Sequence, residues 1–526
     1  MTTIEIVRAG AGSGKTTNLC ETVADAVKSG LDPARLLATT FTKKAAAELK
    51  SRIQSRLLQN DDHAVALKHA DRLELAAIGT VHGVAHQLLS RYALDLGLSP
   101  RLEVLTEQSS DAALRDLLGA VPFESWQPMA DAAASLEVAD LSQKLLALLS
   151  ATRGNRISGD TFRQHMAASA DRVCELLAPN GVLSETPPAE LLYDLAADAL
   201  RQLEARESDV TDATTTARLK LRRLRRGESV VWGHYLTARS LKAGKRSGAH
   251  AMLEPLRLHA ATVQQNPHLH QAVREFSRLL TEQVLSLNEK YISYKSERGL
   301  VDFTDLEVLL LDLLENDELA VRLARDFDLI LVDEFQDTNP LQLAIFQRFQ
   351  QFAPRSRWVG DPKQAIYGFR GTDPELVNSI WGRVPASART HLPKNHRSQR
   401  GLVQLVGTLF TPIFGKDAQQ TPHRSPEPRG VERWVFNTKN QDQDAIALAC
   451  GIAQLHAEGI RYGDIAVLER TNRLLDPLSQ ALDELGIPYL MESPGLFSTR
   501  EGAMLLAVAL WPTETIHLPR QPSSTC

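Results

Sequence analysis

The chain has 526 residues, more than one hydrophobic core can serve, which predicts roughly three or four folding units. Its 43% hydrophobic and 23% charged residues are typical of a globular protein, and a net charge of −5 excludes a generally basic surface, so any nucleic-acid binding must come from local patches. The cysteines lie far apart without a CxxC pair, which argues against a disulfide framework, a zinc site or an iron–sulfur cluster and favours a reducing cytoplasm: Cys20, Cys174, Cys450 and Cys526.

The first predicted element is a strand over Ile4–Val7, followed by a glycine-rich loop and a helix that runs through Val27. The glycines leave room for backbone amides to wrap a polyphosphate, and the helix N-terminus adds partial positive charge. We expect Lys15 to contact the β- and γ-phosphates and Thr16 to hold Mg²⁺. The residues assigned to binding a nucleoside triphosphate are Ala9, Gly10, Ala11, Gly12, Ser13, Gly14, Lys15, Thr16 and Thr17. A strand this early leaves no room for a signal peptide.

Strands and helices alternate after this loop. A second buried strand is predicted over Arg35–Thr42, a helix over Lys43–Leu58, and a third strand over about Leu75–Ile78, ending in the segment Gly79–Gly83. Such alternation after a phosphate loop indicates a parallel α/β domain that binds ligands at the C-terminal ends of its strands.

From about Pro100 to Leu285, Leu and Ala recur at helical spacing, which predicts a mostly helical insertion. It contains a basic run, Arg218–Arg246, that includes Trp232 and Tyr235. Basic residues beside aromatics suit a nucleic-acid backbone with stacked bases. A solvated charged helix face is the slightly favoured alternative.

The α/β pattern resumes near Tyr291. The apolar strand Asp328–Val332 leads into Asp333 and Glu334. Acidic residues at the tip of a buried strand are the usual partner of a phosphate loop: the Asp holds Mg²⁺ and the Glu deprotonates the attacking water. A solvated acidic turn would not need an apolar strand before it. Because this tip lies so far from Lys15 in the chain, the helical stretch must be inserted between the two halves of one site.

A third cluster covers Trp358–Gly371, on the next predicted strand. Gln364 is placed where a neutral side chain could sense the γ-phosphate. Tyr367 and Phe369 are aromatic residues in a loop, outside any core pattern.

Five segments in this order resemble superfamily 1 DNA helicases of the UvrD/Rep type, the broader group that includes the RecB and AddA helicase–nuclease subunits. The resemblance covers about residues 4–95 and 285–510. The segments that carry it are AGAGSGKTT, ATTFTKKAAAEL, DEFQDT, GDPKQAIYGFRG and LPKNHRS.

The resemblance implies an α/β, P-loop NTPase fold with RecA-like parallel-sheet domains and a large helical insertion. Residues 1–95 and 286–388 would form the first RecA-like domain (1A), residues 96–285 the inserted domain (1B), and residues 389–512 a partial second RecA-like domain (2A), starting near Thr390. ATP would lie between the RecA-like domains. Residues 513–526 are expected to be a disordered tail.

The resemblance also implies roles. Asp333 and Thr16 would hold Mg²⁺, Glu334 would be the general base, Gln364 would report the γ-phosphate, and Arg397 would act as an arginine finger. For Phe41 a position in the core is a real alternative to DNA contact, whereas the Phe369–Arg370 pair is the stronger candidate. The residues expected to contact single-stranded DNA are Phe41, Thr42, His82, Tyr367, Phe369 and Arg370.

Some positions depart from the family pattern. The glutamine motif that reads adenine is missing, so specificity for ATP comes from the resemblance alone. His396 replaces the usual aromatic before Arg397, and Val81 and Gly83 beside His82 weaken that DNA contact. After the predicted strand Gly463–Leu468, the sequence contains neither the TxHxxKGLE segment nor the arginine-bearing VALTRA segment. A frameshift or premature stop, or a reduced motor, would explain this.

Two functions are therefore expected. The first is an ATP-dependent, 3′-to-5′ single-strand DNA translocase or helicase for repair, recombination or defence, acting on single strands or duplex–single-strand junctions. The second is a truncated or partner-dependent subunit that binds ATP and DNA, with a nuclease or repair protein as the possible partner. The apolar stretch Ala503–Trp511 is too short to span a bilayer, so we expect a cytoplasmic protein with no membrane association.

Overall fold

The computed structural model describes residues 3–59, 62–99, 101–178, 189–206, 211–224, 231–244, 248–368, 371–425, 431–471, 475–491 and 504–505. The chain divides into two compact units, unit 1 (Met1–Arg429) and unit 2 (Gly430–Cys526). The expected tail, residues 513–526, lies outside the described residues.

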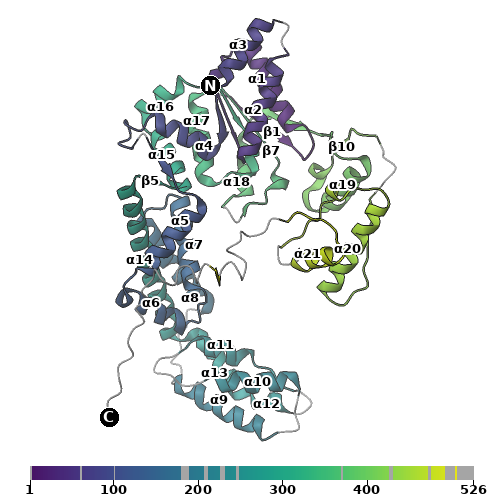
Figure 1. The fold of residues 1–526 in the computed structure, drawn as a ribbon. Helices are drawn as coiled ribbons and strands as arrows, with labels where there is room; N and C mark the ends of the chain where they lie inside the picture. Colours follow the sequence, from purple (N-terminus) through teal and green to yellow (C-terminus); the bar gives the residue numbers. More distant parts are fainter. Residues whose placement is uncertain are drawn as a thin grey trace. The chain divides into compact units, whose positions relative to one another are not determined.

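Unit 1 is built on a six-stranded sheet with the strand order β3-β2-β6-β7-β1-β8 (Figure 1). All neighbouring strands in this sheet are parallel. The strands are β1 (Thr3–Ala9), β2 (Leu36–Thr40), β3 (Ala77–Thr80), β6 (Leu329–Val332), β7 (Arg355–Gly360) and β8 (Arg389–Leu392).

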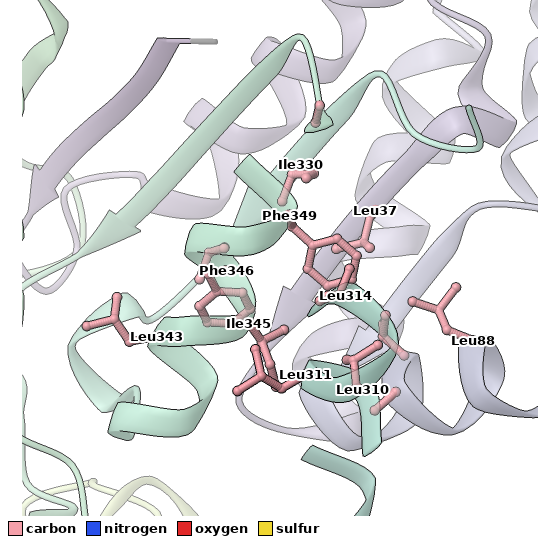
Figure 2. Packing of buried hydrophobic residues seen from close by; sticks show 14 of the residues in the cluster. Leu37, Leu88, Leu310, Leu311, Leu314, Ile330, Leu343, Ile345, Phe346 and Phe349 are labelled. Carbon is pink, nitrogen blue, oxygen red and sulfur yellow. The ribbon is translucent and has the colours of Figure 1, made fainter. Parts of the chain in front are cut away.

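Both faces of the sheet are buried, because successive apolar residues of each central strand point to opposite sides. Ile330 belongs to one core and Leu331 to the other, and Trp358 and Val359 divide in the same way. Figure 2 shows one core, where Leu37 and Ile330 lie beside apolar side chains of α4, α15 and α17. The surrounding helices are α1 (Lys15–Lys28), α2 (Lys43–Leu57), α3 (His63–Leu73), α4 (Val81–Arg91), α15 (Phe303–Glu315), α16 (Asp317–Ala324), α17 (Pro340–Phe352) and α18 (Pro374–Arg383).

This sheet confirms the predicted α/β class, with two differences in detail. The third strand begins at Ala77 rather than near Leu75, which is 61% exposed. The second RecA-like domain was expected to begin near Thr390, but the strand Arg389–Leu392 pairs with β1 as the edge strand of the first sheet. The chain then continues in unit 1 through β9 (Lys394–Asn395), α19 (Arg400–Phe414) and β10 (Thr421–Pro422).

The inserted region is helical, as its sequence pattern predicts. The expected boundary at residue 285 falls inside α14, which continues to Arg298. The helices are α5 (Glu107–Gly119), α6 (Phe123–Ser135), α7 (Leu141–Gly154), α8 (Gly159–Leu177), α9 (Ala189–Glu204), α10 (Asp212–Arg223), α11 (Gly233–Ser240), α12 (Ala249–Met252), α13 (Glu254–Ala261) and α14 (Pro267–Arg298).

The basic run of the insertion folds so that Tyr235 is buried and Trp232 is partly buried. Tyr235 is 2% exposed and Trp232 packs against the same core. Arg218 donates hydrogen bonds to the carbonyl oxygens of Leu203 and Arg206 at the end of α9. These contacts favour the alternative of a charged helix surface over a base-stacking patch for the described part of the run; residues 225–230 and 245–247 lie outside it.

Two features join the insertion to the sheet domain. The short strands β4 (Glu103–Val104) and β5 (Leu300–Val301) pair in parallel. Beside them, Asp302 caps α15 and accepts hydrogen bonds from Arg153 of α7 at 2.7 Å and from Lys295 of α14 at 2.9 Å. Burial alone would raise the pKa of Asp302, but Arg153 and Lys295 outweigh it and hold the pKa at about 2.

Unit 2 contains α20 (Gln441–Ala457) and α21 (Leu475–Glu484), which pack together around Ala449 and Leu482. The prediction of a strand over Gly463–Leu468 was wrong. A 3₁₀ turn covers Tyr462–Asp464, and no strand follows it within residues 465–471. Leu468 is 92% exposed, so this segment lacks the burial that an inner strand requires. Among the described helices, none is long and apolar enough to cross a membrane.

The ion pairs at Asp302 predict a pH-dependent loss of stability. Because the folded-state pKa of about 2 lies below the ordinary 3.8, this carboxylate stabilises the fold above about pH 4, and its contribution is lost as the pH falls toward 2. Asp302→Asn removes one of the two carboxylates that pair with buried Lys295 and Arg153, leaving Asp305, and should lower the free energy of unfolding by roughly 1–3 kcal/mol at pH 7. Urea unfolding at several pH values measures this free energy of unfolding.

The difference between wild type and Asp302→Asn should shrink as the pH is lowered. Asp160→Asn is the matched control, because the Asp160 side chain is 92% exposed and its replacement should change the free energy by less than about 0.5 kcal/mol. A pH-independent difference at Asp302 would contradict the assignment.

Candidate nucleotide and nucleic-acid site

The motifs of unit 1 follow the C-terminal ends of strands in the one sheet, so they gather along a single edge. The loops after β1, β7 and β6 are neighbours because these strands are adjacent. Across the sheet from β3 to β8, the loops carry His82, then Phe41 and Thr42, Asp333 and Glu334, Gln364 and Tyr367, Ala9–Thr17, and finally Arg397. Parallel α/β sheets bind their ligands at this edge.

The phosphate loop joins β1 to α1. Gly12 and Gly14 have φ angles of 74° and 87°, in the left-handed region that favours glycine. Gly14 is the N-cap of α1 and offers no side-chain cap, so the first amides of the helix remain available to an anion. Ser13 closes the loop by donating from its hydroxyl to the carbonyl oxygen of Gly10 at 2.7 Å.

The acidic pair lies at the tip of β6, next to the phosphate loop. Lys15 Nζ lies 2.5 Å from Glu334 Oε2, and both side chains are largely shielded from solvent. Glu334 has a φ of 50°, an uncommon backbone conformation for a non-glycine residue that often marks functional sites. The structure therefore brings together Lys15 and Glu334, which the sequence assigned to one site.

The carboxyl group of Asp333 suits a cation. Burial, with the neighbouring Glu334 charge adding to it, raises the pKa of Asp333 to about 6, and Lys15 only partly counters this. A buried carboxylate without full compensation is stabilised by a divalent cation. Mg²⁺ in such sites takes one or two protein oxygens together with substrate phosphates and water. Asp333 and the Thr16 hydroxyl fit that donor set.

A chain of hydrogen bonds connects the third motif to the phosphate loop. Gln364 donates to Asp361 Oδ2 at 2.7 Å, and the Asp361 amide donates to Gln336 Oε1 at 2.8 Å. Gln336 in turn donates to Glu334 Oε2 at 2.7 Å, the same oxygen that binds Lys15. Gln364 is thus bonded to Asp361, and three successive hydrogen bonds connect Gln364 to the Glu334 carboxylate.

Gly360 makes this connection possible. A Cβ atom at Gly360 would lie 2.7 Å from Gln336 Oε1 and 3.2 Å from the backbone nitrogen of Phe335. Only glycine therefore lets the end of β7 approach the turn after β6 this closely.

Arg397 lies on a turn that packs on the phosphate loop. The amide of His396 donates to the carbonyl oxygen of Gly12 at 2.7 Å. A Cβ atom at Gly12 would lie 2.6 Å from Arg397 Cβ. Arg397 itself is exposed. The rings of His396 and His423 lie 4.5 Å apart.

Of the six residues expected to contact DNA, the structure describes Phe41, Thr42, His82 and Tyr367. The rings of Phe41 and Tyr367 are in tilted contact with centroids 4.4 Å apart. Both are half-buried, and Phe41 belongs to neither core of the sheet. Thr42 is the N-cap of α2 and accepts from the Ala45 amide. Phe369 and Arg370 lie outside the described residues.

His82 is held inside unit 1. Its Nε2 lies 3.0 Å from the carboxylate of Glu307, which is 4% exposed, and its ring lies 4.6 Å from that of Phe303. These contacts to α15 hold the His82 side chain, and its expected contact with DNA stays a prediction.

Sequence reasoning missed two amides beside the phosphate loop. Asn395 lies within the LPKNHRS segment, but in that segment only the arginine two positions later was assigned a role. Gln420 lies near β10, and its Nε2 would be 2.2 Å from a Cβ atom at Gly10. Nothing in the sequence marks Gln420, because only the return of the chain after α19 brings it to the loop.

The two parts of the chain match two family models. Residues 1–384 match the UvrD/REP helicase N-terminal domain, and residues 390–509 match the UvrD-like helicase C-terminal domain. The resemblance proposed from the five sequence segments is thereby confirmed.

Several curated relatives are named as the same subunit of an ATP-dependent helicase/nuclease. The relative from Levilactobacillus brevis is 25% identical over 96% of this chain and 48% of its own length. The Geobacillus thermodenitrificans relative is 26% identical over 96% and 49%. The Ligilactobacillus salivarius relative is 23% identical over 95% and 49%. The chain thus spans about half the length of these relatives.

The close contact at Gly12 predicts that a methyl group there disrupts the site. Gly12→Ala should weaken binding of a fluorescent ATP analogue at least about tenfold, because the new Cβ collides with Arg397 and the φ of 74° is strained. Gly97→Ala is the matched control, since its φ is 68° and nothing lies within 4 Å. Equal nucleotide affinity in the two variants would show that the packing of Arg397 is irrelevant to binding.

Proposed function

Because this chain belongs to the UvrD/REP helicase family, we propose that it is an ATP-driven translocase or helicase of single-stranded DNA, or of duplex–single-strand junctions. The observation that carries the proposal is the position of the Lys15–Glu334 pair and the Phe41–Tyr367 ring pair on one edge of one sheet. We extend it to a role in DNA repair, recombination or defence. The 3′-to-5′ direction rests on the family resemblance.

Nucleotide binding begins with an exchange of partners. The Lys15 ammonium leaves Glu334 for the β- and γ-phosphates, while the amides at the start of α1 surround them. The ion pair keeps the lysine inside the loop until phosphate arrives. Thr16 and Asp333 would hold Mg²⁺, which would supply positive charge against the phosphates.

Hydrolysis uses the carboxylate that this exchange releases. Glu334 accepts a proton from water as the water oxygen bonds to the γ-phosphorus and the bond from that phosphorus to the bridging oxygen of ADP breaks. The products are ADP and inorganic phosphate, and the proton leaves Glu334 for solvent. Arg397, next to the loop, stabilises the charge that develops on the γ-phosphoryl group.

Coupling to DNA passes through the hydrogen-bond chain. Tyr367 lies three residues after Gln364, which is connected through Asp361 and Gln336 to Glu334. A change at the phosphate loop therefore reaches the loop that carries the stacking ring. Base stacking on Phe41 and Tyr367 tolerates any sequence, as a motor requires.

A partner-dependent role is the second candidate. The relatives are named as helicase/nuclease subunits, which supports an assembly with a second protein, and this chain spans about half of their length. In that role the chain would bind ATP and DNA, and it would hydrolyse ATP only when bound to its nuclease or repair partner.

Two substitutions separate binding from hydrolysis. Lys15→Ala should weaken ATP binding at least about tenfold. Glu334→Gln should bind ATP as tightly as wild type or more tightly, because no carboxylate then competes with the phosphates for Lys15. The rate of hydrolysis should fall by about 10²–10⁴. Steady-state phosphate release with and without oligo(dT), beside equilibrium binding of ATP, measures both effects.

Glu297→Gln is the control, since the Glu297 side chain is 71% exposed and the rate should stay at the wild-type value. Wild-type hydrolysis by Glu334→Gln would refute its role as the base. ATP and DNA binding by the wild type without any turnover would reject the autonomous motor and favour the partner-dependent role.

The ring pair predicts a non-additive loss of DNA affinity. Phe41→Ala and Tyr367→Ala should each weaken oligo(dT) binding by roughly 5- to 150-fold, as expected for loss of one stacked base. The double variant should lose less than the product of the two effects, because the rings contact each other with centroids 4.4 Å apart. Fluorescence anisotropy of labelled oligo(dT) provides the measurement.

Tyr367→Phe keeps the ring and should retain wild-type affinity. Phe123→Ala removes a 69% exposed ring of α6 and should have no effect. Unchanged affinity in both Phe41→Ala and Tyr367→Ala would place the DNA path elsewhere.

A further inference from the structure

Asn395 makes four hydrogen bonds through a side chain that is only 5% exposed. Its Nδ2 donates to the carbonyl oxygen of Ala11 at 2.9 Å and to Gln420 Oε1 at 2.8 Å. Its Oδ1 accepts from the amides of Arg397 at 3.0 Å and Ser398 at 2.8 Å. One side-chain amide therefore uses both donors and accepts twice, its full capacity.

These four bonds join three separate parts of unit 1. They connect the phosphate loop at Ala11, the turn that carries Arg397, and the chain next to β10 at Gln420. A second contact reinforces the first connection, because the His396 amide donates to the carbonyl oxygen of Gly12. The Arg397 turn is thus attached to two consecutive carbonyl groups of the phosphate loop.

Gln420 supports Asn395 from the far side. Its Oε1 accepts from Asn395, and its Nε2 is buried against Gly10. Within the described residues, this Nε2 has no hydrogen-bond partner. A buried donor without an acceptor is costly and uncommon in proteins. Its place beside the phosphate loop indicates an acceptor on the bound nucleotide.

We propose that the Asn395–Gln420 pair is an amide clamp that positions Arg397 against the phosphate loop, with the unpaired Gln420 Nε2 amide donating to the nucleotide. The clamp deepens the proposed ATP site and rests on that function. Asn395 is a positioning residue, since it acts on the reaction through Arg397 and the loop backbone. Movement of Ala11 and Gly12 around phosphate is thereby transmitted to the arginine.

A simpler explanation is local. An Asn Oδ1 that accepts from amides two and three residues later forms an ordinary turn, which would stabilise residues 395–398 without reference to nucleotide. Asn395→Asp separates the two explanations. The aspartate keeps the accepting oxygen of the turn, but it loses the Nδ2 donors and faces the oxygens of Ala11 and Gln420 with negative charge. The clamp predicts a defect, whereas the turn alone does not.

The decisive measurement is discrimination between ATPγS and ADP in equilibrium binding. Arg397→Ala should reduce the preference for ATPγS about tenfold, because the arginine serves the γ-phosphoryl group. Asn395→Asp should cause a similar loss. The Asn395→Asp/Arg397→Ala double variant should lose at most about twofold more than either single variant, since both changes remove one arginine contact.

Gln420→Ala should lower ATPγS affinity at least about threefold through loss of its donor. Asn155→Asp is the matched control: its Nδ2 donates to the Ala151 carbonyl oxygen at 2.8 Å on α7, far along the chain from the loop, and nucleotide discrimination should not change. Wild-type discrimination by Asn395→Asp, or fully multiplicative losses in the double variant, would overturn the clamp.

Amide hydrogen exchange tests the clamp without nucleotide. In Asn395→Asp the His396 amide should exchange at least about tenfold faster, because the turn loses its link to Ala11, whereas Arg397→Ala should leave this amide protected. If wild type binds no ATPγS, the proposed function fails, and this exchange difference still decides whether the clamp exists. Unchanged exchange at His396 in Asn395→Asp would refute it.

Discussion

The parallel pairing of β6, β7 and β1 is the constraint on which the site depends. Val332 lies opposite Trp358, which in turn lies opposite Ile6, so the three strands end at almost the same level of the sheet. The phosphate loop, the acidic turn and the Gln364 loop consequently emerge side by side. This register is held by cores on both faces, and Trp358, which belongs to one of them, is completely buried. A sheet buried on both faces cannot slip without exposing apolar side chains, so the positions of Lys15 and Glu334 follow from packing that is remote from the chemistry.

Hydrogen bonds join the loops that the register of the strands brings side by side. The chain Gln364–Asp361–Gln336–Glu334–Lys15 runs across the ends of three strands, through the buried residues Asp361 and Gln336 and through half-buried residues at its ends. Gly360 permits it, since any side chain there would collide with Gln336. Buried amides and carboxylates of this kind have few alternative partners, so breaking one bond leaves an unsatisfied group. The Lys15–Glu334 pair and the loop that carries Gln364 and Tyr367 are therefore joined by a small number of specific contacts rather than by proximity alone.

Ion pairs, in addition to the covalent chain, attach the insertion to the sheet domain. Arg153 from α7 and Lys295 from α14 meet on Asp302, the residue that caps α15. Buried ion pairs contribute little net stability compared with apolar packing, but they are strict about geometry. They fix where α14 ends and α15 begins, and α15 supplies Leu310 and Leu314 to the core beneath β6. A long helical insertion can thus leave the register of the sheet unchanged.

The sequence by itself determined the α/β class, the family, the phosphate loop and the acidic strand tip, because these rest on local patterns: an apolar run, a turn and a short motif. It also identified a helical insertion from its periodicity. It did not determine that Arg389–Leu392 closes the first sheet, that Tyr235 enters a helical core, or that Gly463–Leu468 is not a strand. Strand pairing and burial depend on which distant segments meet, and short apolar runs do not encode their partners. The clearest case is Gln420: only the return of the chain after α19 places it on Gly10, and no local pattern could have marked it.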